Sequence, residues 1–470
     1  MPADSDEVRR RLGHAEPRLY VGAGEAGTAF AGHQQAVLVL GPPRSGKTTT
    51  LVVPNVLWWP GAVVSTSTKP DVMAATAGHR RQLGRCWLFD PSGSTQAPAG
   101  VQEVRWSPVA AAVRWEEALL TARAMVGAAR PGQSWGEAAH WTERAEALLA
   151  PLFHAAALSG AAIGAVVRWV LRRDLGPARA TLAGHGAAMA ADVLAGLAAT
   201  DEREMSGIWS TAAGVLAAYR STAAVAAGQS PNVEVAELSR TTDTVYICAP
   251  ARAQALVAPI VVAFLEQVRA GAFRAAAAGA GRLPVVLALD EVANVAPLPD
   301  LPALVSEGGG QGVMTLACLQ DLSQARHRWG RQADGFLSLF GTKVILGGIA
   351  DLSTLEQVSR LGGEVDVARR SVSRGPWWGP GRGAPTLNWS PHRQRRLPVD
   401  ALNQLPPGRA VVISGWSRPG LVWLPPWWEA GGAGRPRPPL APSPDPPPPP
   451  GPAGPAPGEG RVRRRPFLGL

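Results

Sequence analysis

A glycine-containing loop at residues 41–48 (GPPRSGKT) is the first part of the sequence with a recognisable chemistry. It fits the pattern G-x-x-x-x-G-K-[S/T], in which backbone N–H groups surround the phosphates of a nucleotide. The helix predicted after the loop adds the positive end of its dipole. The residues predicted to bind the phosphate chain are Gly41, Arg44, Ser45, Gly46, Lys47, Thr48 and Thr49.

The lysine in this loop is informative because lysine is rare in the chain. Only Lys47, Lys69 and Lys343 occur among 46 lysines and arginines. A compact ammonium group suits the β- and γ-phosphates, whereas arginine presents a planar fork. We therefore expect Lys47 to neutralise these phosphates and the Thr48 hydroxyl to ligate Mg²⁺. The alternative is a plain Gly/Pro turn between a strand and a helix, and the retained lysine argues against it.

Two adjacent carboxylates, Asp290 and Glu291, follow the apolar stretch LPVVLAL. In open α/β sheets, ligands bind outside the carboxyl ends of the strands. Asp290 is predicted to hold Mg²⁺, and Glu291 to polarise the attacking water. The alternative is an ordinary helix N-cap with an acidic first turn. The presence of the Lys47 loop favours the functional interpretation.

A glutamine ends the next apolar stretch, residues 313–319. At the tip of a neighbouring strand, the Gln320 amide could contact the γ-phosphate or order the water, although an ordinary loop amide is the alternative. The predicted catalytic residues are thus Lys47, Glu291 and Gln320. Thr48 and Asp290 are the predicted metal ligands, and ATP and Mg²⁺ are the predicted cofactors.

The elements that position these residues are predicted from the hydrophobic pattern. Short apolar runs alternate with helical patterns, which indicates an α/β fold with a mainly parallel sheet covered on both faces. Helices are predicted at residues 48–59 and 71–81. Strands are predicted at residues 35–40, 62–66, 86–90, 244–249, 284–290, 313–320, 343–347 and 410–414.

Changes in composition predict four parts of the chain. Residues 1–110 begin a nucleotide-binding domain, which residues 233–430 complete. Residues 111–232 are alanine-rich, with apolar side chains at helical spacing, and are predicted to form an inserted all-helical domain. Residues 431–470 are proline-rich and end in a basic cluster, which predicts a disordered tail.

The overall composition excludes several classes of protein. The 470 residues include three cysteines, Cys86, Cys248 and Cys318, which are too far apart for a zinc site and argue against a disulfide framework. No run of about 18 apolar residues predicts a membrane span, and the N-terminus lacks a signal-peptide pattern. We therefore expect a cytoplasmic protein that reaches the inner face of the cell membrane only through a partner. A net charge of +10 mildly favours polyanionic partners.

Taken together, these residues resemble the TraG/TraD-type coupling proteins of type IV secretion systems. The resemblance covers roughly residues 18–430. It is carried by GPPRSGKTTT (41–50), VSTSTKPD (64–71), FDP (89–91), WSP (106–108), LALDE (287–291), LQDLSQ (319–324), GTK (341–343), SRLG (359–362) and LPPG (405–408).

This resemblance implies a RecA-like P-loop NTPase domain with an all-helical domain, assembled as a hexamer with ATP sites between subunits. Its implied task is to deliver DNA, with a relaxase or another secreted substrate, to the type IV secretion channel. Lys47 and Thr48 match the family's phosphate and Mg²⁺ residues. Asp290 and Glu291 match its metal- and water-binding pair, and Gln320 matches its γ-phosphate sensor.

The sequence departs from the family at two places. Family members commonly carry an N-terminal membrane anchor, whereas this chain starts almost at the nucleotide-binding domain. Relatives often place an arginine after the helix that follows the acidic strand, where it reaches a neighbour's nucleotide, but residues 306–312 contain none. Candidates for this role elsewhere are Arg326, Arg328 and Arg360.

Two other functions and one further segment stay open at this point. An FtsK-like pump for double-stranded DNA is one alternative, although no C-terminal DNA-reading domain is evident. A non-hydrolysing nucleotide-binding adaptor that recruits secretion substrates is the other. Residues 368–398 mix arginines with tryptophans, which suits either nucleic acid or a solvated loop whose tryptophans cover the domain edge.

Overall fold

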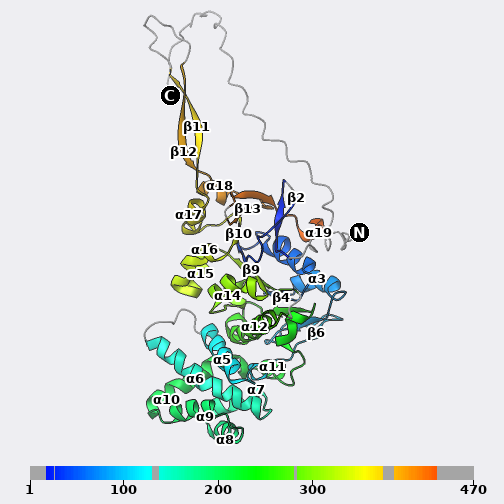
Figure 1. The fold of residues 1–470 in the computed structure, drawn as a ribbon, viewed down its shortest axis with the longest axis vertical. Coiled ribbons are helices and arrows are strands. Elements are labelled where there is room, and N and C mark those ends of the chain that lie inside the picture. The colour runs from blue at the N-terminus through cyan, green and yellow to red at the C-terminus, as the bar shows by residue number, and fades with distance from the viewer. Residues whose placement is uncertain are drawn as a thin grey trace, which may run out of the picture. The chain divides into compact units, whose positions relative to one another are not determined.

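A twelve-stranded sheet forms the centre of the computed structural model (Figure 1). The structure describes residues 17–25, 27–129, 137–279, 283–373, 386–415 and 417–430. The predicted tail at residues 431–470 lies outside this part of the chain. In spatial order the strands are β2 (Gly27–Phe30), β1 (Tyr20–Gly24), β14 (Gly420–Trp423), β13 (Arg409–Ser414), β10 (Thr342–Leu346), β3 (Val37–Leu40), β9 (Val313–Leu319), β8 (Val285–Leu289), β4 (Val63–Ser67), β7 (Thr244–Cys248), β5 (Cys86–Phe89) and β6 (Gln102–Glu103).

The strands from β10 to β6 all run parallel, and β13, β14, β1 and β2 add an antiparallel edge. The central strands are buried along their whole length. Burial on both faces explains why their sequences are continuous apolar runs rather than alternating ones. The predicted α/β fold with a mainly parallel sheet is confirmed.

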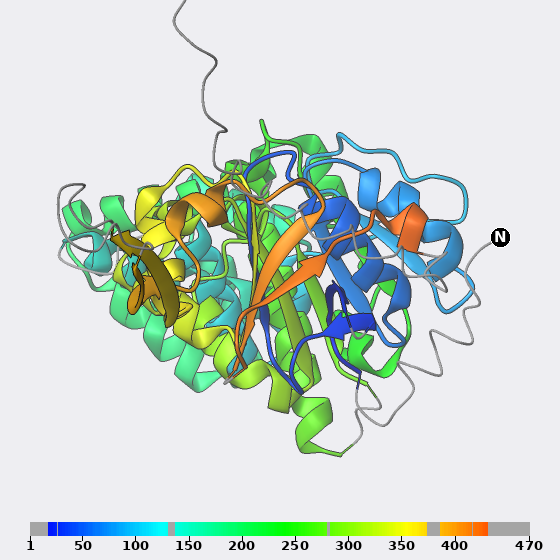
Figure 2. The same ribbon diagram turned by 90° about the horizontal axis from the view of Figure 1, so that it is seen from above.

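Each face of the sheet has its own hydrophobic core, and Figure 2 shows helices on both sides. Val37 and Val39 of β3 belong to the first core, on the first face of the sheet. Leu38 and Leu40 belong to the second core, on the second face, because successive strand side chains point to opposite faces. The first core is covered by the π-helical turn η1 (Thr48–Val52), α2 (Val53–Trp58) and α3 (Asp71–Arg80), with α19 (Trp427–Ala430) beside them.

The described residues between β6 and β7 form helices without a strand. They are α4 (Pro108–Ala111), α5 (Trp115–Ala129), α6 (Glu137–Leu158), α7 (Ile163–Arg172), α8 (Gly176–Gly184), α9 (Ala188–Ala198), α10 (Glu202–Val215), η2 (Ala217–Arg220), α11 (Thr222–Ala227) and η3 (Val235–Arg240). Their apolar side chains join the core on the second face of the sheet. The division of the chain at residues 110, 232 and 430 stays a prediction.

The helical segment reaches the sheet through α12 (Gln254–Ala277), which packs against α5 and η3. Among the described residues, α12 is the one helix long and apolar enough to cross a membrane by length and composition. Its position in the second core accounts for that composition, because most of the helix is buried.

The remaining elements follow the strands on the second face or leave the sheet. The helices are α13 (Val292–Val295), α14 (Leu301–Glu307), η4 (Gly308–Gln311), α15 (Leu322–Trp329), η5 (Gly330–Gly335), α16 (Phe336–Leu339), α17 (Leu352–Leu361) and α18 (Val399–Asn403). Between α17 and α18, β11 (Glu364–Ser373) and β12 (Thr386–Arg395) pair as a separate ribbon. The loop considered for residues 368–398 is therefore partly strand.

A fully buried arginine, Arg80, connects α3 to the sheet by hydrogen bonds. Its guanidinium donates hydrogen bonds to the carbonyl oxygens of Trp59, Gly61 (2.7 Å) and Thr242 (3.0 Å), and to Thr244 Oγ1 (2.6 Å). Burial lowers the pKa of Arg80 from its ordinary value. These acceptors compensate for the loss of water around the charge, which is costly without partners.

We expect Arg80→Ala to lower the free energy of unfolding by about 3 kcal/mol, because it leaves buried acceptors without a donor. The measurement is the midpoint of urea unfolding. The matched control is Arg81→Ala, which removes one exposed hydrogen bond of 2.8 Å to the carbonyl of Ala99. Its effect should stay below about 1 kcal/mol. Equal losses in the two variants would contradict this assignment.

Candidate nucleotide-binding site

The loop between β3 and η1 is held in an unusual backbone conformation. Gly46 has φ +95° and Arg44 has φ +64°, both in the left-handed region. Such a conformation suits glycine and is rare for arginine. At Gly41, a Cβ atom would lie 2.8 Å from Ser45 Oγ and 3.0 Å from Leu346 Cβ, so a larger residue would have to displace these neighbours. The loop is thus curled tightly over the end of the sheet.

Lys47 and Thr48 are both held in place by hydrogen bonds. The Lys47 ammonium donates hydrogen bonds to the carbonyl oxygens of Gly41 (2.6 Å) and Pro42 (2.9 Å), and the side chain is only 6% exposed. Thr48 begins the helix, and its hydroxyl donates to Asp290 Oδ2 at 2.5 Å. One lysine and one hydroxyl therefore lie at the junction of loop and helix.

The order of the strands brings the acidic residues under this loop. β9 lies between β3 and β8, with Leu40 opposite Leu319 and Leu289 opposite Ala317. Because parallel strands end at the same edge of a sheet, the loop after β3 and the carboxylates after β8 meet across the tip of β9. Gln320 stands at that tip.

Asp290 is almost fully buried, at 6% exposure. Its backbone carbonyl accepts a hydrogen bond from Thr66 Oγ1 at 2.9 Å, which fixes the end of β8 to β4. Burial raises the pKa of Asp290 from 3.8 to about 6, while the hydrogen bond from Thr48 opposes the rise and the nearby Glu291 carboxylate adds to it. A buried carboxylate beside a lysine and a hydroxyl is a suitable ligand for a hard cation.

Glu291 adopts φ +54°, the left-handed region, just before α13. A non-glycine residue in this region stores strain of order 1–3 kcal/mol, and such residues cluster at functional sites. The Asn294 amide donates to Glu291 Oε2 at 3.3 Å. At this strained turn the adjacent carboxylates of Asp290 and Glu291 point in different directions. Among the described residues, only the Asp290 carboxylate contacts Thr48.

Gln320 is held by its backbone. Its N–H donates to Gln324 Oε1 at 3.0 Å, and Asp321 caps α15 by accepting from the Gln324 N–H at 3.1 Å. No hydrogen bond of the Gln320 side chain is found among the described residues, so its amide is free for a ligand. Sequence reasoning missed Thr66 and Gln324, which position the site. A polar residue inside a buried strand was the available signal for Thr66.

The described residues fit a nucleotide with its magnesium ion. Ser45 Oγ is buried inside the loop without a hydrogen-bond partner, as expected of a loop shaped around an absent group. Within the described ranges, no group of three or more His, Cys, Asp or Glu residues could hold a metal alone. Mg²⁺ commonly takes one or two protein ligands and completes its shell with phosphate and water. Thr48 and Asp290 meet that requirement.

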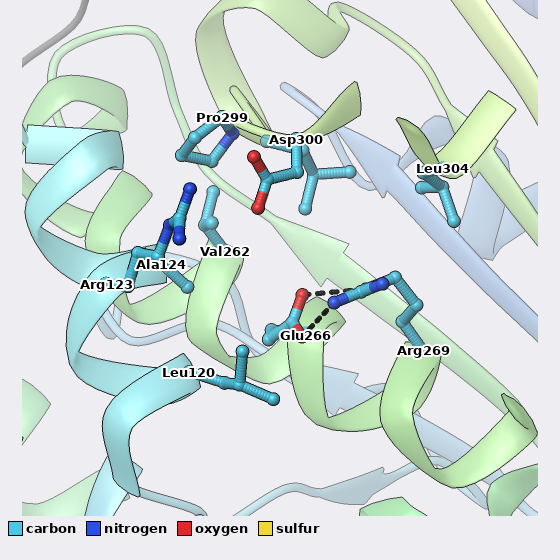
Figure 3. A pocket seen from close by; sticks show the side chains of 10 residues that line it. Leu120, Arg123, Ala124, Val262, Glu266, Arg269, Pro299, Asp300 and Leu304 are labelled. Carbon is cyan, nitrogen blue, oxygen red and sulfur yellow. Dashed lines mark hydrogen bonds and ion pairs between the residues drawn. The ribbon is translucent and has the colours of Figure 1, made fainter. Parts of the chain in front are cut away.

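A small cavity elsewhere does not compete with this site. It lies between α5, α12 and α14 and contains the Glu266–Arg269 ion pair, at 2.5 Å (Figure 3). Its volume of about 20 Å³ holds about one water molecule, which is far too small for a nucleotide.

The three arginines considered for a role at a neighbour's nucleotide have different environments. Arg326 forms an ion pair with Asp351 at 3.2 Å. Arg328 donates to the carbonyl of Ala128, at the end of α5, and burial lowers the pKa of Arg328 to about 10. Arg360 is mostly exposed. Their roles stay predictions.

Comparison with known protein families decides the relationship that this geometry suggests. The sequence matches the family described as "Type IV secretory system Conjugative DNA transfer" over residues 4–382. The chain belongs to this family. The resemblance to coupling proteins of type IV secretion is thereby confirmed. No curated protein matches the sequence in the corresponding comparison.

Solved structures show the fold of this conjugative DNA transfer family. An unbound form of the bacterial conjugative coupling protein TrwB is 17% identical in sequence, with a TM-score of 0.64. The match covers 89% of this chain and 91% of the TrwB chain. The complex of TrwB with the non-hydrolysable ATP analogue ADPNP is 18% identical, covers 84% and 86%, and has a TM-score of 0.63. The complex of TrwB with ADP and Mg²⁺ is 17% identical, with the same coverage and a TM-score of 0.61. The predicted RecA-like fold is confirmed.

The raised pKa of Asp290 predicts a dependence of stability on pH. A carboxyl group with a raised pKa in the folded state favours folding at low pH, and this contribution is lost as the pH rises from about 4 through about 6. In the absence of divalent cations, we expect Asp290→Asn to be more stable than the wild type at pH 8, by on the order of 2 kcal/mol. The difference should vanish near pH 4.

Thermal unfolding midpoints between pH 4 and 8 measure this difference. Asp300→Asn is the matched control, because Asp300 is exposed, and this variant should follow the wild type throughout. An Asp290→Asn variant that is less stable at pH 8 would show that the carboxylate stabilises the fold instead.

Proposed function

We propose that this protein hydrolyses ATP and uses the energy to move DNA in conjugative transfer. The observation that carries the proposal is the contact of Thr48 with Asp290 across the tip of β9, beside the buried ammonium of Lys47. This arrangement unites a phosphate-binding loop, a metal-binding carboxylate and a second carboxylate, Glu291, at one edge of the sheet. Family membership supplies the link to DNA transfer.

Each side chain has a distinct role in the proposed reaction. The loop amides and Lys47 bind and neutralise the phosphates, while Thr48 and Asp290 hold Mg²⁺. Glu291 orients the attacking water and accepts its proton, and the Gln320 amide donates to the γ-phosphate or positions that water. When bound, the magnesium ion neutralises the charge on the phosphate oxygens.

The partners in this proposal come from the family resemblance and the related complexes. TrwB structures contain ADPNP, or ADP with Mg²⁺, which supports ATP and Mg²⁺ as ligands here. We infer that the chain acts as a homo-hexamer and delivers DNA, with a relaxase or another substrate, to the type IV secretion channel. It works in the cytoplasm and meets the membrane through a partner.

Replacement of Glu291 by glutamine should separate ATP binding from ATP hydrolysis. We expect Glu291→Gln to retain ATP while its hydrolysis rate falls about 10²–10⁴-fold, because the proton acceptor is lost. Lys47→Ala should lose both binding and hydrolysis. The measurements are steady-state ATP turnover, with and without single- and double-stranded DNA, and binding of a fluorescent ATP analogue.

The matched control is Glu202→Gln, at the exposed start of α10, which should turn over ATP like the wild type. Turnover by the wild type that DNA does not change would count against a DNA motor. ATP binding without any turnover would favour the non-hydrolysing adaptor. Stimulation by double-stranded DNA alone would favour the FtsK-like pump.

Removal of the Gln320 side chain tests the third catalytic assignment. We expect Gln320→Ala to lower hydrolysis about 10²-fold with little change in ATP affinity, because the amide acts on the charge that develops during the reaction. The backbone bond to Gln324 remains in this variant. Gln357→Ala on α17 is the control. Wild-type turnover in Gln320→Ala would leave Gln320 as an ordinary loop amide.

A further inference from the structure

The ribbon of β11 and β12 is a part of the fold that the nucleotide site does not use. Ten residue pairs join the two strands, from Glu364 with Arg395 to Ser373 with Thr386. Neither strand pairs with the twelve-stranded sheet. Figure 1 shows the two strands side by side beyond α17 and α18. A two-stranded hairpin without a packed face is marginally stable in water.

Among the described side chains, exposed apolar ones occur on both faces of the ribbon. Successive strand residues point to opposite faces, so Val365 and Val367 share one face while Val372 lies on the other. Trp389 pairs with Arg370 and therefore shares the face of Val372. Trp389 is 64% exposed and covers no domain edge, which overturns that interpretation of this tryptophan. An indole ring that is exposed to water is accessible to a binding partner.

The two strands carry an excess of positive charge. Together β11 and β12 contain four arginines and two acidic residues, a net charge of +2. Arg393 and Arg395 share one carboxylate, that of Glu364, at 2.8 and 3.8 Å. Asp366 lies opposite Arg393 in the register, yet the Arg393 side chain remains 78% exposed, so its guanidinium is accessible to a phosphate. The ribbon therefore offers excess charge to a polyanion.

Three classes of partner could meet an exposed ribbon, and its details favour one. Addition of a strand from another protein to β12 is hindered by Pro391, which has no N–H to donate. An element that lies on a membrane needs one apolar and one polar face, whereas here apolar side chains occur on both faces. DNA offers phosphates that exposed arginines can bind and, where it is single-stranded, bases on which an exposed tryptophan can stack.

We propose that the β11–β12 ribbon binds DNA, with Arg393 and Arg395 on backbone phosphates and Trp389 stacked on an unpaired base. Guanidinium groups suit phosphate oxygens, and aromatic rings stack on bases of any sequence. This inference rests on the proposed function, because it names the surface through which the ATPase holds the DNA that it moves.

Salt dependence of DNA binding tests the arginine contacts in the full chain. The probes are a labelled oligothymidylate and a duplex of the same length. For Arg393→Gln combined with Arg395→Gln, the slope of log affinity against log salt for the single strand should fall by about 1.4, since each phosphate contact contributes about 0.7. The matched control is Arg172→Gln with Arg179→Gln, which removes two exposed charges from α7 and α8 and should leave the slope unchanged.

Substitution of the tryptophan tests the stacking contact. Trp389→Ala should weaken binding of the single strand about tenfold, and weaken duplex binding less. Trp428→Ala is the matched control, because Trp428 of α19 is similarly exposed, at 59%. All variants should hydrolyse ATP at the basal rate of the wild type, which also shows that they are folded.

The outcomes separate this inference from the proposed function. Wild-type DNA affinity and salt slope in the ribbon variants, with DNA-stimulated ATP turnover intact, would overturn the ribbon assignment and leave the function standing. A wild-type protein that neither binds DNA nor hydrolyses ATP would overturn both. Binding to vesicles of anionic phospholipid that the arginine variant loses, while its DNA binding is unchanged, would make the ribbon a membrane contact and overturn the assignment.

Discussion

The hydrogen bond from Thr48 to Asp290 joins residues that are 242 positions apart in the chain, at 2.5 Å. It forms because β3 and β8 end at the same edge of the sheet, separated only by β9. The parallel ladder of the sheet fixes that register, and the curled backbone at Gly46 carries the loop over β9. Sheet order, loop conformation and the two helical layers are thus conditions for a single contact.

The site carries strain and uncompensated polarity that the rest of the structure must offset. Asp290 is buried with a raised pKa, Glu291 and Arg44 lie in the left-handed region, and Ser45 Oγ has no partner. Each of these features destabilises the fold of the protein without its ligands. The two cores on either face of the sheet supply the opposing stability. Such a concentration of unfavourable features in one place is what a binding site for phosphate and a cation requires.

The helical segment and the β11–β12 ribbon both lie outside the nucleotide site. α15 begins two residues after Gln320, and Arg328 near its end donates to the carbonyl of Ala128 in the helical segment. The β11–β12 ribbon is attached beyond α17, away from the parallel ladder, so its surface can meet a large ligand without disturbing the nucleotide site.

The sequence by itself determined the central strands and predicted the candidate site residues beyond their ends. Asp290 and Gln320 directly follow buried parallel strands, and the loop that holds Lys47 follows another. Such strands are continuous apolar runs that local pattern reveals. The tertiary structure decided what depends on partners distant in the chain. It placed β9 between β3 and β8, aimed the Thr66 hydroxyl at the end of β8, and left Trp389 in solvent. The edge strands β1, β2 and β14 and the ribbon escaped prediction, because half-exposed strands lack a continuous apolar run and form only when a neighbouring strand supplies their hydrogen bonds.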